Sequence, residues 1–222
     1  MKRKKTMDDR SINKIVNAYK EKKALYGEFC LTMQNLLIQL LDNNGYKYQI
    51  AHRIKSLDSL TNKIQTKWKE GKECRKLDDI YDLAGIRIVF YLERDKRRFI
   101  SDLYKELTPQ NLTLKERHKE KGYRATHVIA SFGKKRLSLG EYKKFKNMLC
   151  EIQLTSALYH AWSEIEHDIF YKGDFSNLKQ NSDIIKLKKD LENTMTKYIE
   201  KASSSFEKVA EKVKELGNNK KA

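Results

Sequence analysis

Residues 148–171, MLCEIQLTSALYHAWSEIEHDIFY, predict a β-strand that runs directly into an α-helix. Along the strand, apolar and polar side chains alternate, so one face can enter a core while Glu151 and Gln153 project from the other. Thr155 or Ser156 can cap the helix. Apolar helix residues that we expect to face the sheet recur at helical spacing, at Leu158, Trp162, Ile165 and Ile169. The stretch exposes a carboxylate and an amide to a ligand, although a structural ion pair of Glu151 would give the same pattern.

The composition is that of a basic globular protein. The chain has 222 residues, 39% of them hydrophobic, and its 47 Lys+Arg against 30 Asp+Glu give a formal net charge of +17. Such an excess favours a polyanionic partner, such as nucleotide phosphates, RNA, DNA or an anionic surface, over a merely lysine-rich surface. The three cysteines include no CxxC pair, which favours a reducing, cytoplasmic location over a disulfide framework. No apolar stretch follows the basic N-terminus, so we expect neither a secretory signal nor a membrane partner.

The pattern along the chain predicts an α/β (α+β) fold, a mixed sheet of about four or five strands with helices packed on it. We expect a helical N-terminal extension over 1–45, the α/β domain over 46–172 and a helical C-terminal extension over 173–222. Central strands are expected from Ala84 onward, in the stretch AGIRIVFY, and again after Gly122. Local predictions elsewhere are a strand at 46–50, a helix over 52–68, a polar loop over 108–121 and a short strand at 136–139.

Two carboxylates stand at sheet positions where a ligand could sit. Asp82 comes just before one central strand, and Glu151 lies within another. Basic and hydroxyl groups accompany them, namely Arg53, Lys55, Ser59, Lys63 and Arg87, and a glycine-containing turn adds Lys119, Tyr123, Arg124 and His127. This set is typical of a nucleotide site, because cations neutralise phosphates, one carboxylate can hold Mg²⁺, a second can accept a hydroxyl proton, and a tyrosine ring can stack on a base. No Walker A glycine loop is present, which excludes a P-loop enzyme.

Four blocks of the sequence resemble the synthetase domain of the RelA/SpoT family. They are RIKSLDSLTNK (53–63), DDIYDLAGIRI (78–88), KEKGYRATH (119–127) and CEIQLTSALYHAWSEIEHD (150–168). The resemblance implies a nucleotidyltransferase-like fold and a pyrophosphokinase, which transfers the β,γ-pyrophosphate of ATP to the 3′-hydroxyl of a ribose. The length of the chain is similar to that of small, stand-alone alarmone synthetases.

The same resemblance implies a role for each matching residue. Asp82 corresponds to the Mg²⁺ ligand, and Glu151 to the acid that activates or orients the acceptor hydroxyl, with a further contact to the metal. The residues that correspond to the ATP-binding pattern are Arg53, Lys55, Ser59, Lys63 and Arg87. The residues expected on the acceptor side are Lys119, Tyr123, Arg124, His127 and Gln153, with Tyr123 as the stacking ring.

Two departures from the family pattern lie on the acceptor side. Thr155 stands where the family block Glu-Ile-Gln-Ile-Arg-Thr has arginine, and Ala125 stands where the family turn has serine. Together with the net charge they favour the 3′-CCA end of tRNA as acceptor, as in the toxic branch of the small synthetases, where an antitoxin protein is the expected partner. GDP or GTP is the alternative acceptor, which would make the chain a (p)ppGpp synthetase, and an adenine nucleotide is a third. Homo-oligomers are also compatible with the helical ends.

Two other classes of function are open on sequence alone. A catalytically dead RNA-binding module would use the basic loops and Tyr123, but it would not need two acids among basic residues. A zinc hydrolase could use a polar stripe of the helix, His160, Glu164 and His167, whose spacing permits one helical face. We favour the ATP-dependent enzyme over both.

Overall fold

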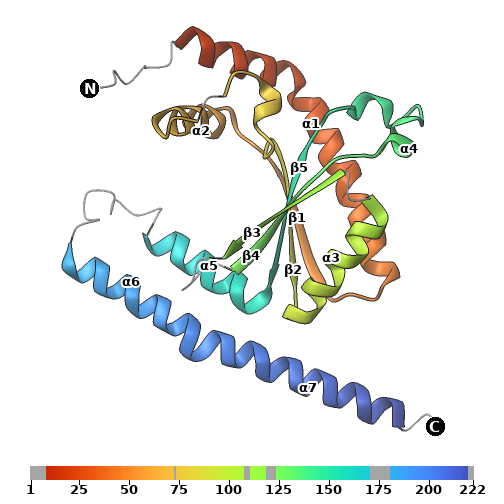
Figure 1. Cartoon of the computed structure of the whole chain (residues 1–222), viewed down its shortest axis with the longest axis vertical. Helices are drawn as coiled ribbons and strands as arrows, with labels where there is room; N and C mark the ends of the chain where they lie inside the picture. The colour runs from red at the N-terminus through yellow and green to blue at the C-terminus, as the bar shows by residue number, and fades with distance from the viewer. Residues whose placement is uncertain (1–8, 73, 108–110, 119–123, 171–180, 220–222) are drawn as a thin grey trace.

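The five strands form one mixed sheet at the centre of the molecule (Figure 1), and this confirms the predicted fold class. The structure is a computed structural model that describes residues 9–72, 74–107, 111–118, 124–170 and 181–219. The strand order is β1-β2-β5-β4-β3, where β2 and β5 are parallel and the other neighbours are antiparallel. The strands are β1 Tyr48–Ile54, β2 Ala84–Phe90, β3 Leu112–His118, β4 Arg124–Ala130 and β5 Cys150–Ser156.

Helices flank the sheet and extend the chain at both ends. They are α1 Asp9–Asn43, α2 Leu57–Lys69, α3 Glu93–Leu107, the short α4 Lys134–Leu137, α5 Ala157–Phe170, α6 Ser182–Thr194 and α7 Glu200–Asn219. A π-helical turn, Met195–Ile199, joins α6 to α7, and Figure 1 shows the two as one long helical arm. Among the described residues, no helix is both long and apolar enough to cross a membrane.

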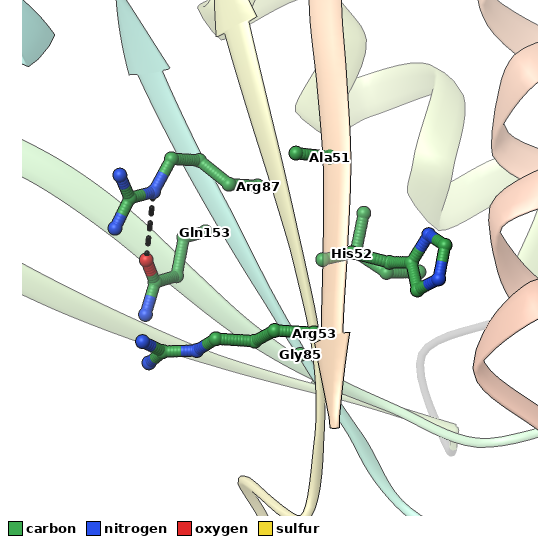
Figure 2. A pocket seen from close by; sticks show the side chains of 7 residues that line it. Ala51, His52, Arg53, Gly85, Arg87 and Gln153 are labelled. Atoms are coloured by element: carbon green, nitrogen blue, oxygen red, sulfur yellow. Dashed lines mark hydrogen bonds between the residues drawn. The ribbon is translucent and has the colours of Figure 1, made fainter. Parts of the chain in front are cut away.

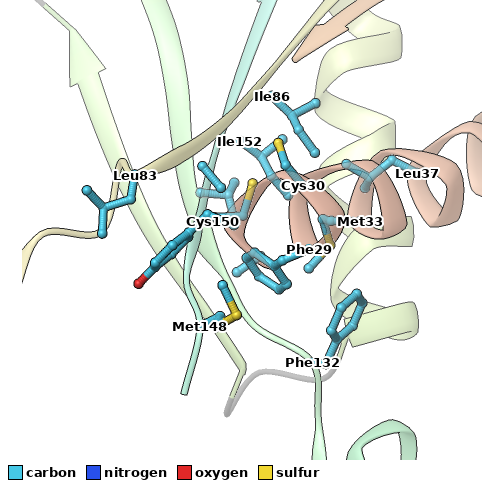
Figure 3. Packing of buried hydrophobic residues seen from close by; sticks show 14 of the residues in the cluster. Phe29, Cys30, Met33, Leu37, Leu83, Ile86, Phe132, Met148, Cys150 and Ile152 are labelled. Atoms are coloured by element: carbon cyan, nitrogen blue, oxygen red, sulfur yellow. The ribbon is translucent and has the colours of Figure 1, made fainter. Parts of the chain in front are cut away.

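The main core lies between one face of the sheet and the long helix α1. Because side chains alternate along a strand, Ile86 of β2 and Ile152 of β5 point to the same side, where Figure 3 shows them against Phe29 and Met33 of α1. These four side chains have essentially no exposed surface. The opposite face of β2 and β5 is therefore left for polar groups, as the alternation predicts.

The helix α5 packs differently from the prediction. Ile165 and Ile169, expected to face the sheet, are each 49% exposed. The buried face instead carries Tyr159 and Trp162, which form a second, small core with Met195 of the C-terminal arm. The Trp162 indole donates a hydrogen bond to the Leu191 carbonyl at 3.0 Å. The helix turns its apolar face toward this arm, whose position no local periodicity could reveal.

Four element boundaries also differ from the prediction. The first strand continues through residues 51–54, where a helix was expected, and α2 begins after Ser56, whose hydroxyl accepts a hydrogen bond from the Ser59 amide at 3.1 Å. The expected polar loop contains the edge strand β3, Leu112–His118. The expected short strand at 136–139 overlaps α4 instead.

Candidate active site

Asp82 is held by two lysines just before β2. Its Oδ2 accepts from Lys55 Nζ at 2.9 Å and from Lys63 Nζ at 2.5 Å, and the carboxylate side chain is only 9% exposed. Burial by itself raises the pKa of Asp82, but the hydrogen bonds from Lys63 and Lys55 outweigh it and the pKa falls below its usual value. The predicted ATP-binding lysines and the predicted metal ligand are thus in direct contact.

The two lysines reach Asp82 from differently anchored segments. Lys55 lies in the short link between β1 and α2, where its amide donates to the Leu83 carbonyl at 3.0 Å and its carbonyl accepts from the buried Tyr19 hydroxyl at 2.7 Å. Lys63 projects from α2, with its ammonium 5.5 Å from the centre of the Tyr81 ring. The first lysine is fixed through its backbone next to the site, whereas the second reaches Asp82 with its side chain from the helix and lies over the Tyr81 ring.

Glu151 is buried on β5 between an imidazole and a side-chain amide. Its Oε1 lies 3.1 Å from His127 Nδ1 on β4, and its Oε2 accepts from Gln153 Nε2 at 3.0 Å. Burial raises the pKa of this carboxyl, but the hydrogen bonds from His127 and Gln153 more than compensate, and the pKa falls to about 2. Glu151 is therefore ionised throughout the physiological range.

Lys63 connects the two carboxylates. Its ammonium interacts electrostatically with Glu151 as well as with Asp82. Lys63 is therefore in contact with Asp82 and close enough to Glu151 to act on its charge.

Arg87 extends the network of Glu151 toward α5. In the parallel register of β2 and β5, Arg87 lies opposite Gln153, and its Nε donates to Gln153 Oε1 at 3.4 Å (Figure 2). Its terminal nitrogen donates to Glu164 Oε1 on α5 at 2.7 Å. Because Arg87 holds the amide oxygen, the amide nitrogen of Gln153 points to Glu151. Glu164 is thus the beginning of a chain of contacts that ends on the predicted catalytic acid.

A cavity of about 270 Å³ opens beside Arg53, Arg87 and Gln153. Figure 2 shows these three side chains pointing to the same side of the sheet. Arg53 is opposite Gly85 in the antiparallel register and lies across it, so that a Cβ at Gly85 would meet Arg53 Cγ at 3.4 Å. Arg53 therefore lies against the backbone of β2 at Gly85, along the wall of the cavity.

The other predicted site residues are not in contact with Asp82 or Glu151, or lie outside the described residues. Ser59 is exposed in the first turn of α2, where its Oγ accepts from the Ser56 hydroxyl at 2.8 Å. Arg124 is bound to Glu200 at the start of α7, and its guanidinium lies 5.9 Å from the centre of the Tyr159 ring. Lys119 and Tyr123 lie outside the described residues.

Sequence reasoning missed Glu164 as part of this network. The residue was placed in the polar stripe of a zinc hydrolase, whereas the structure commits its carboxylate to Arg87 and brings His160 Nδ1 within 3.8 Å of it. Burial and the nearby Arg87 lower the pKa of His160. The one available signal was the spacing of Glu164 from His160, four residues on one helical face.

The donor set fits a divalent cation bound together with phosphates. Asp82 Oδ1 is buried and has no hydrogen-bond partner among the described residues, so one hard oxygen is not committed to a lysine. Within that part of the chain, no group of three or more His, Cys, Asp or Glu residues forms a metal cluster. Mg²⁺ is commonly bound by one or two carboxylates with substrate phosphates and waters completing the shell. Asp82, with Glu151 nearby, matches this kind of site.

Comparisons with known proteins agree with the sequence blocks. Residues 52–176 match the family model described as "Region found in RelA / SpoT proteins". The GTP pyrophosphokinase YwaC of Bacillus subtilis (strain 168) is 30% identical over 144 residues, which cover 60% of this chain and 63% of that relative.

Solved structures show the same fold. The small alarmone synthetase 2 from Bacillus subtilis aligns with a TM-score of 0.62 and 21% identity, covering 86% of this chain and 98% of its own. The small alarmone synthetase 1 from that organism aligns with a TM-score of 0.61 and 20% identity, covering 94% and 100%. These matches and the family model confirm the predicted resemblance, and the chain belongs to the RelA/SpoT family.

Proposed function

We propose that this chain is a pyrophosphokinase that transfers the β,γ-pyrophosphate of ATP to a ribose 3′-hydroxyl. The observation that carries the proposal is a pair of buried carboxylates: Asp82 is bound by Lys55 and Lys63, and Glu151, on whose charge Lys63 also acts, is bound by His127 and Gln153. Family membership and the name of the relative, GTP pyrophosphokinase, support the same reaction. A module that only binds RNA would have no use for two buried acids at such a position.

The basic residues and Asp82 would have different roles in the reaction. Lys55, Lys63, Arg53 and Arg87 would bind the phosphate chain and neutralise its charge. Asp82 would hold Mg²⁺, which when bound neutralises the phosphates further and favours their in-line geometry. During transfer the acceptor oxygen forms a bond to the β-phosphorus as the bond between that phosphorus and the bridging oxygen of the α-phosphate breaks, so AMP leaves.

Glu151 would position the acceptor hydroxyl. With a pKa of about 2 it is a weak base, so it would orient the attacking oxygen by accepting its hydrogen bond and would take the hydroxyl proton only as the new bond to phosphorus forms and the hydroxyl becomes strongly acidic. Its own carboxylate is oriented by His127 and Gln153 from the rigid sheet. This assigns His127 and Gln153 to the acceptor side through their contact with Glu151.

A guanosine di- or triphosphate is the acceptor that the relatives favour. One of the solved structures similar in fold is the small alarmone synthetase 1 from Bacillus subtilis bound to its product pppGpp, with a TM-score of 0.55 and 19% identity. The name of the relative, GTP pyrophosphokinase YwaC, includes GTP. On this proposal the chain makes an alarmone of the (p)ppGpp type.

The 3′-CCA end of tRNA is the second candidate acceptor. The net charge of +17 favours it, since an RNA offers many more phosphate contacts than a mononucleotide does. In that case the chain would inhibit translation, and a neutralising antitoxin protein would be its partner.

One labelling experiment tests both the reaction and the acceptor. The protein is incubated with Mg²⁺ and γ-³²P-ATP, together with GDP, GTP or deacylated tRNA in separate reactions. We expect label on a guanosine nucleotide with stoichiometric AMP. Label on tRNA alone would replace the first acceptor by the second, and the absence of AMP with every acceptor would refute the enzyme proposal.

A further inference from the structure

Asp82 carries two ammonium groups on one oxygen while its other oxygen has none. Oδ2 accepts from Lys55 and Lys63 at 2.9 and 2.5 Å, and Oδ1 is buried without a hydrogen-bond partner among the described residues. Oδ2 is thus shared by two cations, while Glu151, the other carboxylate on which Lys63 acts, is hydrogen-bonded to His127 and Gln153. A polyanion such as a phosphate chain can therefore compete with Asp82 for one of the two lysines.

The two lysines differ in how readily they can leave. Lys55 is 12% exposed, and its backbone is hydrogen-bonded on both sides, to Leu83 and to Tyr19. Lys63 is 27% exposed and reaches Asp82 with a long, flexible side chain from α2. Lys63 also acts electrostatically on Glu151, so it carries its positive charge close to both carboxylates.

We infer that Lys63 closes Asp82 to divalent cations in the resting chain and that a nucleotide triphosphate opens it. The inference rests on the proposed function, because it takes ATP as the polyanion that draws Lys63 away. The phosphate chain competes with the carboxylate for the Lys63 ammonium, while Lys55 stays on Asp82 and keeps it ionised. Metal binding at Asp82 is therefore coupled to nucleotide binding, and a divalent cation alone binds poorly.

Metal binding in the absence of nucleotide directly tests whether Lys63 keeps divalent cations from Asp82. Mn²⁺ is titrated into the nucleotide-free chain and the unbound ion is measured by electron paramagnetic resonance. We expect Lys63→Met to bind Mn²⁺ about tenfold more tightly than the wild type, because a cation in contact with the ligand is removed. Lys63→Gln, which keeps a polar side chain, should behave similarly and serves if the methionine variant folds poorly.

A matched control distinguishes the direct contact of a lysine with Asp82 from the general effect of removing one positive charge. Lys67 lies one turn further along α2 and donates to the Asp79 carbonyl at 3.2 Å, so Lys67→Met removes the same charge without touching Asp82. We expect its Mn²⁺ affinity to remain within about twofold of the wild type, since Lys67 binds the Asp79 carbonyl and not Asp82. The gain from Lys63→Met should also disappear in the double variant with Asp82→Asn. Equal Mn²⁺ affinity in the wild type and both Lys63 variants would overturn the inference.

Nucleotide binding without metal gives the reciprocal measurement. In excess EDTA, Asp82→Asn should bind ATP about three- to tenfold more tightly than the wild type, because Lys63 no longer has to leave a carboxylate. Weaker or unchanged binding by Asp82→Asn would contradict the competition. If neither protein binds ATP, the proposed function fails, while the Mn²⁺ titration still decides whether Lys63 closes Asp82.

Discussion

The two carboxylates of the site are held in contrasting ways. Asp82 is bound by charged lysines from a link and a helix, whereas Glu151 is bound by an imidazole and an amide that project from β4 and β5. Lysine side chains exchange partners easily, but side chains on paired central strands are fixed by the sheet. The comparison teaches that the lysines around Asp82 can exchange partners, whereas the sheet holds the Glu151 carboxylate in place.

Removing the fixed carboxylate should give the largest effect. Glu151→Gln keeps the size of the side chain but loses the charge that orients the acceptor hydroxyl, so we expect kcat to fall by about 10²- to 10⁴-fold. The rate of AMP release in the presence of acceptor measures it. The exposed Glu141→Gln serves as a control for loss of one negative charge. A Glu151→Gln enzyme with wild-type kcat would remove Glu151 from the reaction.

The stability of the fold should also depend on Glu151 in acid. The folded pKa of about 2 lies below the ordinary 4.5, so the charged form stabilises the folded state above pH 4.5, and this contribution is lost as the pH falls from 4.5 toward 2. The difference in unfolding free energy between wild type and Glu151→Gln should therefore shrink by about 2 kcal/mol between pH 7 and pH 3.

Urea unfolding of both proteins at several pH values measures this difference. Carboxylates common to the two proteins cancel in the comparison, which isolates Glu151. A difference that is the same at pH 7 and pH 3 would mean that His127 and Gln153 do not hold the carboxylate as tightly as their distances indicate.

The contact between Arg87 and Glu164 should matter less, because it is solvent-exposed. The Arg87 and Glu164 side chains are 36% and 50% exposed, and ion pairs of this kind contribute about 0.5–1 kcal/mol. Glu164→Gln should lower kcat/KM about two- to fivefold by loosening Arg87 and, through it, Gln153. Glu164→Asp, which keeps the carboxylate, should lower kcat/KM less than Glu164→Gln does. The control Glu211→Gln, on the exposed face of α7, should leave kcat/KM unchanged.

Steady-state kinetics with ATP varied decide the role of Glu164. A positioning residue changes KM for ATP or kcat while the melting temperature stays the same. A lower melting temperature with unchanged kinetics would show that Glu164 serves only to dock α5 on the sheet.

Local alternation allowed the central strands and the polar face to be predicted. The pattern of β2 and β5 placed Arg87, Glu151 and Gln153 on the same side, because side-chain direction in a strand depends only on its own sequence. The edge strand β3 was missed, since LTLKERH is polar enough to resemble a loop and only pairing with β4 makes it a strand. Similarly, the burial of α5 depends on Met195, more than twenty residues away in sequence.

The same limit applies to the site. Lys55, Lys63 and Asp82 could be chosen from their sequence blocks, but their mutual contact depends on how the link after β1 meets the segment before β2. Glu164 was visible as a polar residue at helical spacing, yet its partner Arg87 is 77 residues away. Residue types predict the chemistry of the site, whereas tertiary packing decides which charges meet.

The smallest expected effect concerns Arg124, which was predicted on the acceptor side but is bound to Glu200 of the C-terminal arm. Its Nε is buried without a partner among the described residues, so only part of the guanidinium is satisfied there. Glu200→Gln should release Arg124 and lower KM for the acceptor about twofold, while KM for ATP stays constant. A fall in melting temperature with both KM values unchanged would show instead that Arg124 fastens α7 to β4. In that case the hydrogen-bonded side chains around Glu151 would extend no further than Gln153, and neither Arg124 nor the C-terminal arm would contribute to acceptor binding.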